Sequence, residues 1–142
     1  MSRIMGIDYG DARIGVSISD PIGIIASDLC VIKNTGIEDV ILRFKELLEE
    51  YDISKFVVGL PLNMNDSEGF QAQKVRAFAK ELEVFNKPII FVDERLSSQK
   101  AESILKELKV DKKTIRYTSD SKAASIILQD YLDYNWEVKC WI

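Results

Sequence analysis

The order of the secondary-structure elements constrains this fold most, because three strand-like segments come before the first helix. These segments are Arg3–Asp8, Arg13–Ser19 and about Ile24–Lys33, and each is rich in apolar residues. The four residues Tyr9–Ala12 separate the first two, and a turn at Pro21–Gly23 separates the next two. Connections this short join neighbouring antiparallel strands, whereas a parallel crossover needs a dozen residues or more. The first third of the chain therefore predicts a three-stranded meander.

The rest of the chain alternates helices with strands. Apolar residues at intervals of three and four predict four helices, at Ile37–Tyr51, around Val75–Leu82, around Ala101–Leu108 and from near Ser119 to about Tyr134. Short apolar runs at Lys55–Leu60 and Pro88–Asp93 predict the fourth and fifth strands, and the charged stretch Lys109–Thr118 predicts a loop. We therefore expect an α/β fold in one domain over residues 1–142, with a mixed five-stranded sheet of three antiparallel strands followed by parallel strands, and helices on its faces. This is the order of a ribonuclease-H-like domain, and it differs from a Rossmann domain, which alternates from its first strand.

Composition narrows the chemistry that this chain can perform. The 142 residues include no histidine, which excludes Ser-His-Asp and Cys-His catalysis and any zinc site that depends on imidazole. A net charge of −4 argues mildly against a nucleic-acid partner, although a local basic face can coexist with an acidic total. No apolar run reaches the roughly 20 residues that span a bilayer, and the N-terminus lacks a secretory pattern. We therefore expect a cytoplasmic protein with no membrane partner, whose chemistry depends mainly on carboxylates.

Acidic residues from three distant segments are candidates for one site. Asp8 ends the first strand, Asp93 and Glu94 end the fifth, and Asp120 opens the last helix. In the expected sheet the first, fourth and fifth strands are close neighbours, and their carboxyl ends share an edge. Adjacent strand residues point to opposite faces, so only one of Asp93 and Glu94 can face Asp8, and the spacing does not choose between them. Each acid also has a local explanation, because aspartate favours turns and an acidic residue at a helix start favours the helix dipole.

Three carboxylates that converge at a sheet edge repel one another unless cations lie between them. Ligand sets made of oxygen atoms suit Mg²⁺ or Mn²⁺. Two such ions, about 4 Å apart, can activate a water and stabilise the leaving oxygen of a phosphodiester without any histidine. The acidic positions therefore favour metal-dependent hydrolysis of a phosphodiester.

Four sequence blocks carry a resemblance to a known family. They are, in order, Gly6–Gly10 with Arg13–Val16 and Ser19–Asp20, then Val58–Met64, Asp93–Ser97, and Asp120–Ala124 running on to Ile127–Gln129. Together they closely resemble the YqgF/RuvX family, the Holliday-junction-resolvase-like proteins of the ribonuclease H superfamily. The resemblance implies metal-dependent cleavage of structured nucleic acid. Bacterial members of the family are regarded as nucleases that mature the 5′ end of 16S ribosomal RNA, with an older assignment as junction resolvases.

Carried onto this chain, the resemblance implies that Asp8, Glu94 and Asp120 are catalytic and hold the metal, Mg²⁺ or Mn²⁺. It implies structured RNA as the substrate, with branched DNA and ribosomal precursor particles as further candidate partners, and either a monomer or a homodimer. The chain departs from the family at Ala12, where a lysine is usual, and at Asp66, where a glycine is common. Neither departure changes a carboxylate.

Further residues could bind the substrate. Arg13 and Arg95 flank the proposed site, and a guanidinium fork can hold a phosphate; the missing lysine at position 12 gives Arg13 more of that role. Asn63 lies on the loop after the fourth strand, where turn formation explains it equally well. A basic run before the last helix is either a solvated face or a patch that tracks a nucleic-acid backbone, with Tyr117 available to stack a base. The run consists of Lys106, Lys109, Lys112, Lys113 and Arg116.

Three rival functions fit parts of the sequence. Resolution of four-way DNA junctions would use the same chemistry, and it normally needs two active sites held by a dimer. The opening strand–turn–strand is also similar to the phosphate loop of actin-like ATPases and sugar kinases, but those enzymes close two such domains around the nucleotide. A non-catalytic RNA- or protein-binding module would keep the fold, yet it would gain by losing negative charge near phosphate.

Overall fold

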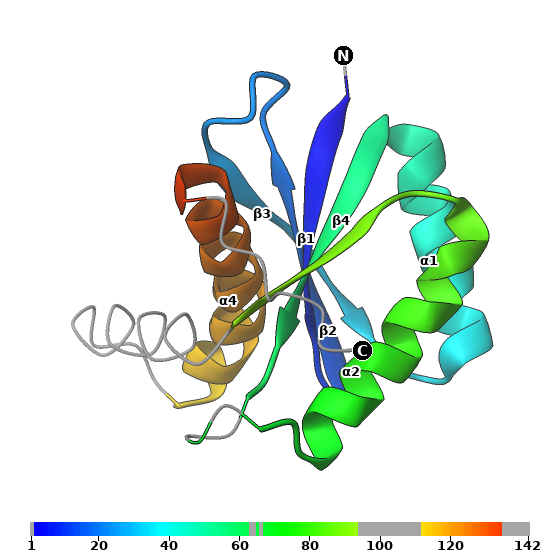
Figure 1. Cartoon of the computed structure of the whole chain (residues 1–142), viewed down its shortest axis with the longest axis vertical. Coiled ribbons are helices and arrows are strands. Elements are labelled where there is room, and N and C mark those ends of the chain that lie inside the picture. Colours follow the sequence, from blue (N-terminus) through cyan, green and yellow to red (C-terminus); the bar gives the residue numbers. More distant parts are fainter. Residues whose placement is uncertain (1, 63–64, 66, 94–111, 135–142) are drawn as a thin grey trace.

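Five strands form one mixed sheet in the order β3-β2-β1-β4-β5 (Figure 1). The computed structural model describes residues 2–62, 65, 67–93 and 112–134, and for residues 112–121 and 134 it describes the helical backbone alone. The strands are β1 (Arg3–Tyr9), β2 (Arg13–Ser19), β3 (Ala26–Lys33), β4 (Ile53–Leu60) and β5 (Ile89–Asp93). The first three pair antiparallel, and β4 pairs parallel with both β1 and β5. The predicted mixed sheet and its meander are thereby confirmed.

Helices cover both faces of the sheet (Figure 1). On one face lie α1 (Ile37–Glu50) and α2 (Phe70–Leu82), which is followed by a short 3₁₀ turn, η1 (Glu83–Phe85). The aromatic rings of Phe44, Phe56 and Phe78 pack together beneath them. The other face is covered by α4 (Lys112–Tyr134), whose Ile127 and Leu128 are fully buried. No helix in the described part of the chain is long and apolar enough to cross a membrane.

Helix α4 packs directly against β1 at Gly6. A Cβ atom on this glycine would lie 2.7 Å from Cβ of Leu128 and 3.0 Å from the carbonyl oxygen of Ala124, and it would also strike Oγ of Ser17. The Ser17 hydroxyl donates a hydrogen bond of 2.8 Å to the same Ala124 carbonyl. Glycine in a strand interior often marks such a close backbone approach. These contacts therefore fix the distance between α4 and β1.

Contacts along α4 also fix its direction. Near the helix C-terminus, the hydroxyl of Tyr131 accepts a hydrogen bond of 3.1 Å from Nζ of Lys55, which is paired with Ile4 near the start of β1. Ala124 and Leu128 lie beside Gly6, further along the strand. The helix therefore runs antiparallel to β1, with its N-terminal half towards the carboxyl end of the strand (Figure 1).

The start of α4 differs from the prediction. The sequence suggests a loop over Lys109–Thr118 and a helix from near Ser119, whereas α4 already begins at Lys112. Lysine and arginine are good helix formers, so a high charge density does not by itself indicate a loop. The loop prediction is wrong from residue 112 onwards. The helix predicted around Ala101–Leu108 lies outside the described residues.

Candidate functional site

Asp8 lies on the face of the sheet that α4 covers. Its strand neighbours Met5 and Ile7 are buried in the core beneath α1 and α2, and strand residues alternate between faces. Asp8 therefore shares the opposite face with Gly6, one residue before β1 ends. The position is partly buried, so its carboxylate is shielded on some sides and accessible on others. The end of β1 thus presents an acidic group beneath the N-terminal half of α4.

Glycines surround Asp8 on this face. Gly15 is its partner on β2, and Gly59 occupies the adjacent position on β4. Gly6 lies two residues earlier on the same strand. Glycine within a strand marks the close approach of another backbone or of a ligand, and α4 accounts for Gly6. Gly15 and Gly59 are both buried, so the backbone on either side of the carboxylate is covered. Sequence reasoning missed this feature, since it appears only when the strands are aligned.

Arg13 stands on the same face as Asp8. It begins β2, where Ile14 and Val16 point into the core beneath α1 and α2, so Arg13 and Gly15 point to the α4 face. Because Asp8 pairs with Gly15, Arg13 occupies the diagonal position, at a typical separation of about 7–8 Å. An arginine side chain spans that separation easily. The structure thus places one predicted phosphate-binding residue beside one predicted metal ligand.

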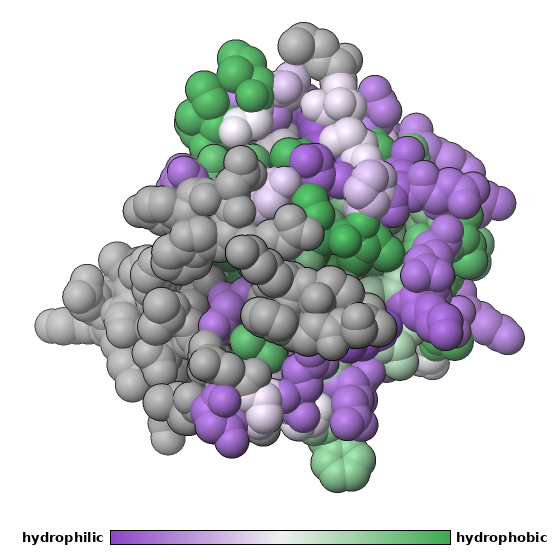
Figure 2. Space-filling model, in the orientation of Figure 1, coloured by the Kyte–Doolittle hydropathy of each residue, from purple (hydrophilic) through white to green (hydrophobic). Residues whose placement is uncertain are grey.

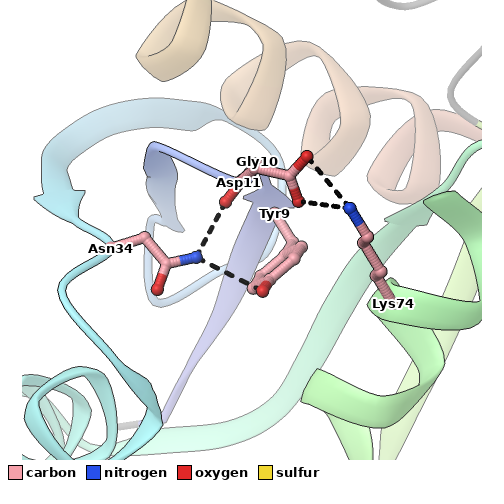
Figure 3. Close-up of polar contacts among 5 residues, drawn as sticks. All are labelled: Tyr9, Gly10, Asp11, Asn34 and Lys74. Carbon is pink, nitrogen blue, oxygen red and sulfur yellow. Dashed lines mark hydrogen bonds and ion pairs between the residues drawn. The ribbon is translucent and has the colours of Figure 1, made fainter.

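Two side chains from distant parts of the chain contact the turn that follows Asp8 (Figure 3). Nδ2 of Asn34, which follows β3, donates hydrogen bonds to the hydroxyl of Tyr9 at 3.2 Å and to the carbonyl of Gly10 at 3.0 Å. From α2, Nζ of Lys74 reaches both carboxylate oxygens of Asp11 at 3.3 Å. The hydrogen bonds from Asn34 hold the turn between β1 and β2, and with it the spacing of the two predicted site residues, whereas the exposed Lys74–Asp11 pair adds only a weak contact. The sequence gives no signal for them, because Asn34 and Lys74 lie far away in the chain.

The strand register decides which face Asp93 occupies. Asp93 is the partner of Leu60, and the preceding pairs along the two strands put Val58 beside Phe91. All three apolar side chains belong to the core beneath α1 and α2. Asp93 therefore points to the face opposite Asp8, a choice that residue spacing alone left open. Glu94 lies outside the described residues.

Position 120 lies inside α4 rather than at its start. The helix begins at Lys112, so Asp120 is in its third turn, and the interpretation of Asp120 as a charge at a helix N-terminus is wrong. Aspartate is a poor residue for a helix interior, so its presence needs another reason. Position 120 is four residues before Ala124, or about 6 Å along the helix towards the carboxyl end of β1. The helix backbone at residue 120 is thus directed towards the end of the sheet where Asp8 lies.

Several predicted residues lie outside what the structure describes. Asn63, Glu94 and Arg95 are among them, and of Asp120 the backbone alone is described. Within the described side chains, no group of three acidic or cysteine residues is close enough to hold a metal ion. The structure thus brings Asp8 and Arg13 together on one face.

A partly buried ion pair braces the segment that leads from β4 into α2. Nε and Nη2 of Arg76 donate to the two carboxylate oxygens of Glu68 at 2.6 and 2.7 Å, and each side chain is about a quarter exposed. Glu68 also forms an isolated β-bridge with Leu62. The hydrogen bond from Arg76, helped by its charge, lowers the pKa of the Glu68 carboxyl below its ordinary value of 4.5. The start of α2 is therefore tied to the end of β4.

Replacing Glu68 with glutamine is expected to lower the free energy of unfolding by about 1 kcal/mol at pH 7. The folded pKa lies below the unfolded one, so this stabilisation is complete above about pH 4.5 and is lost as the pH falls further. Urea denaturation at pH 7 and at pH 3.5 should show the difference between variant and parent shrinking. As a control, Glu46→Gln removes an ion pair with Arg43 in which both side chains are half exposed, and it should cost only a few tenths of a kcal/mol. An equal loss at both pH values would contradict the prediction.

Comparison with known proteins gives matches over nearly the whole chain. The model of the RuvX family, described as Holliday junction resolvase, matches residues 2–134. A protein of Natranaerobius thermophilus is 46% identical over 92% of this chain and 94% of its own length. One of Dictyoglomus thermophilum is 41% identical over 92% of this chain and 95% of its own. Both carry the name "Putative pre-16S rRNA nuclease".

Solved structures match the fold. RuvC of Thermus thermophilus, in complex with a Holliday junction substrate, aligns with a TM-score of 0.60 over 96% of this chain and 99% of its own, at 15% identity. The yeast mitochondrial Holliday junction resolvase aligns with a TM-score of 0.55 over 92% of this chain and 78% of its own, at 13% identity. At such low identity these alignments show a shared fold, of the ribonuclease-H-like resolvase type.

Proposed function

This chain belongs to the RuvX family, and from that membership we propose that it is a divalent-metal-dependent endonuclease that processes the 5′ end of pre-16S rRNA. One observation carries the proposal on the structural side. Asp8 stands at the carboxyl end of β1, flanked by glycines and by Arg13, on the face where α4 crosses the sheet. A partly buried carboxylate at a strand end, with an arginine on the same face, suits a bound cation and a phosphate.

We propose Asp8, Glu94 and Asp120 as the metal ligands. Asp93 points away from Asp8, and alternation along an extended strand would bring the next residue to the Asp8 face. Asp120 lies on the helix that crosses that face, one turn nearer the end of β1 than Ala124. A donor set of carboxylate oxygens without histidine fits a hard cation, and Mg²⁺ or Mn²⁺ is the proposed choice.

The metal and the residues around it would have different roles in cleavage. When bound, the metal supplies an activated water and stabilises the charge on the leaving oxygen. Arg13 would hold the scissile phosphate through its planar guanidinium, with Arg95 and Asn63 as further substrate contacts. Asn34 keeps the turn after Asp8 in place through its hydrogen bonds to Tyr9 and Gly10, so the carboxylate and Arg13 stay at a fixed separation. In this proposal no side chain of the protein has to act as a general base.

The same site would act on RNA within ribosomal precursor particles in the cytoplasm. Four-way DNA junctions are the second candidate substrate, because the family model carries the resolvase description. Cutting a junction requires paired incisions, and hence two sites held in a dimer. A monomer in solution would favour the RNA substrate, whereas a stable homodimer would favour the junction.

One assay with two substrates tests the proposal. Purified protein is given a precursor 16S leader RNA and a synthetic four-way DNA junction, each with Mg²⁺, with Mn²⁺ and with excess chelator. We expect metal-dependent cleavage of the leader RNA, and none with chelator. Cleavage of the junction alone would favour the second candidate, and failure to cut either substrate would contradict the nuclease proposal.

A further inference from the structure

Phe70, the first residue of α2, has the most exposed large apolar side chain in the described part of the chain, at 85%. Apolar surface projects from the lower edge of the molecule, where α2 begins (Figures 1 and 2). Single exposed apolar residues are common, so exposure alone does not indicate a role. The surroundings of this ring are what distinguish it.

The backbone that carries Phe70 is held in place. The ion pair between Glu68 and Arg76 and the bridge between Glu68 and Leu62 fix the chain just before it. After it, Ala72 and Val75 are buried against the core. The backbone beneath the exposed ring is therefore already ordered, so stacking would order only the Phe70 side chain.

A cation lies next to Phe70 on the same side of α2, and a hollow lies further along the helix. Lys74 is one helical turn further on, and residues four apart lie on one face of a helix. Its ammonium group contacts Asp11 in the turn that follows β1 (Figure 3), so this part of α2 lies at the same end of the sheet as Asp8, on the opposite face. Beyond Lys74 is an open hollow of about 270 Å³, lined in part by the stacked rings of Tyr9 and Phe78.

We propose that Phe70 stacks on a base of a single-stranded RNA segment while Lys74 contacts a phosphate of the same strand. An exposed aromatic ring beside a cation is the arrangement that binds single strands without reading their sequence. The Lys74–Asp11 pair does not prevent this contact. Both of its side chains are at least half exposed, and such surface pairs are worth little, so a phosphate can compete for the ammonium group. The inference rests on the proposed nuclease function, because it assigns a contact to that enzyme's substrate.

Binding is measured in excess chelator, so that no strand is cut. The probe is a single-stranded oligonucleotide of leader RNA sequence that carries 2-aminopurine, followed by its fluorescence quenching and by anisotropy. Phe70→Ala should weaken binding roughly 5- to 150-fold and abolish most of the quenching. Phe70→Leu should behave like Phe70→Ala, whereas Phe70→Tyr should restore both signals. Lys74→Ala should reduce the slope of log affinity against log salt by about one.

Leu42→Ala is the matched control, because Leu42 is 56% exposed on α1 and lies outside the proposed contact. It should leave binding unchanged. If Phe70→Ala and Phe70→Leu bind and quench like the parent while the parent cuts leader RNA, the stacking role is overturned and the nuclease function stands. If quenching depends on Phe70 but the parent cuts nothing, the contact stands and the nuclease function fails. If the parent does not bind the oligonucleotide, the stacking role is overturned.

Discussion

Asp8→Asn is expected to reduce metal-dependent cleavage of leader RNA by at least about a thousand-fold. The amide keeps the shape of the side chain but loses the charge that holds a divalent cation, and a bound metal lowers the barrier by several kcal/mol. The rate is measured in single-turnover reactions with Mg²⁺ and again with Mn²⁺. RNA binding in chelator should stay within about twofold of the parent, since the proposed stacking contact does not involve Asp8.

Asp93→Asn is the matched control for this loss. It removes the same charge from a strand of the same sheet, but Asp93 shares its face with Leu60, away from Asp8. We expect the Asp93 variant to cut RNA at a rate within a few-fold of the parent. Equal activity of the Asp8 variant and the parent would remove Asp8 from the catalytic site. A loss at Asp93 as large as that at Asp8 would contradict the assignment of the two faces.

Gly6→Ala should both destabilise the protein and impair cleavage. The new methyl group would overlap Leu128 and the Ala124 carbonyl, so α4 must move away from β1. Overpacking of this kind costs about 1–3 kcal/mol, which corresponds to a fall in melting temperature of roughly 3–10 °C for a chain of this size. The displaced helix carries Asp120, a proposed metal ligand, and a shift of about 1 Å in a catalytic group can cost about a hundred-fold in rate.

Thermal denaturation and single-turnover cleavage, well below the melting temperature, separate these two effects. Ser17→Ala is the comparison, because it removes the hydrogen bond to Ala124 without adding volume between helix and sheet. We expect it to cost about 1 kcal/mol of stability and to leave the cleavage rate nearly unchanged. A Gly6→Ala protein with the stability and cleavage rate of the parent would show that α4 does not pack closely against β1 at Gly6.

Local patterns predicted the strands well and the last helix less well. Segments such as Arg13–Ser19 alternate or run apolar between turn residues, and these signals are short-range, so the meander follows from them. The start of α4 does not follow from the charge pattern, because Lys112 and Arg116 have high helix propensity as well as charge.

The candidate site depends on contacts that no local pattern contains. Spacing showed that Asp93 and Glu94 cannot both face Asp8, but the choice required the pairing of β4 with β5. The turn after Asp8 is contacted by Asn34 and Lys74, and these residues reach the turn only after the sheet and α2 are in place. Sequence reasoning therefore identified which residue types matter, and tertiary structure was needed to show which of them share a face.

The contact between Ser17 and Ala124 joins residues 107 positions apart, so the first strands and the last helix meet late in the synthesis of the chain. Contacts this distant in sequence are slow to form, and domains on the ribosome are completed from the N-terminal end. A nascent chain can pair β1, β2 and β3 while α4 is still unmade. Asp8 and Asp120 would then be held apart until the final helix docks. A nuclease built in this way would gain its activity as the last step of its own folding, and unfinished chains would be unable to cut RNA beside the ribosome that makes them.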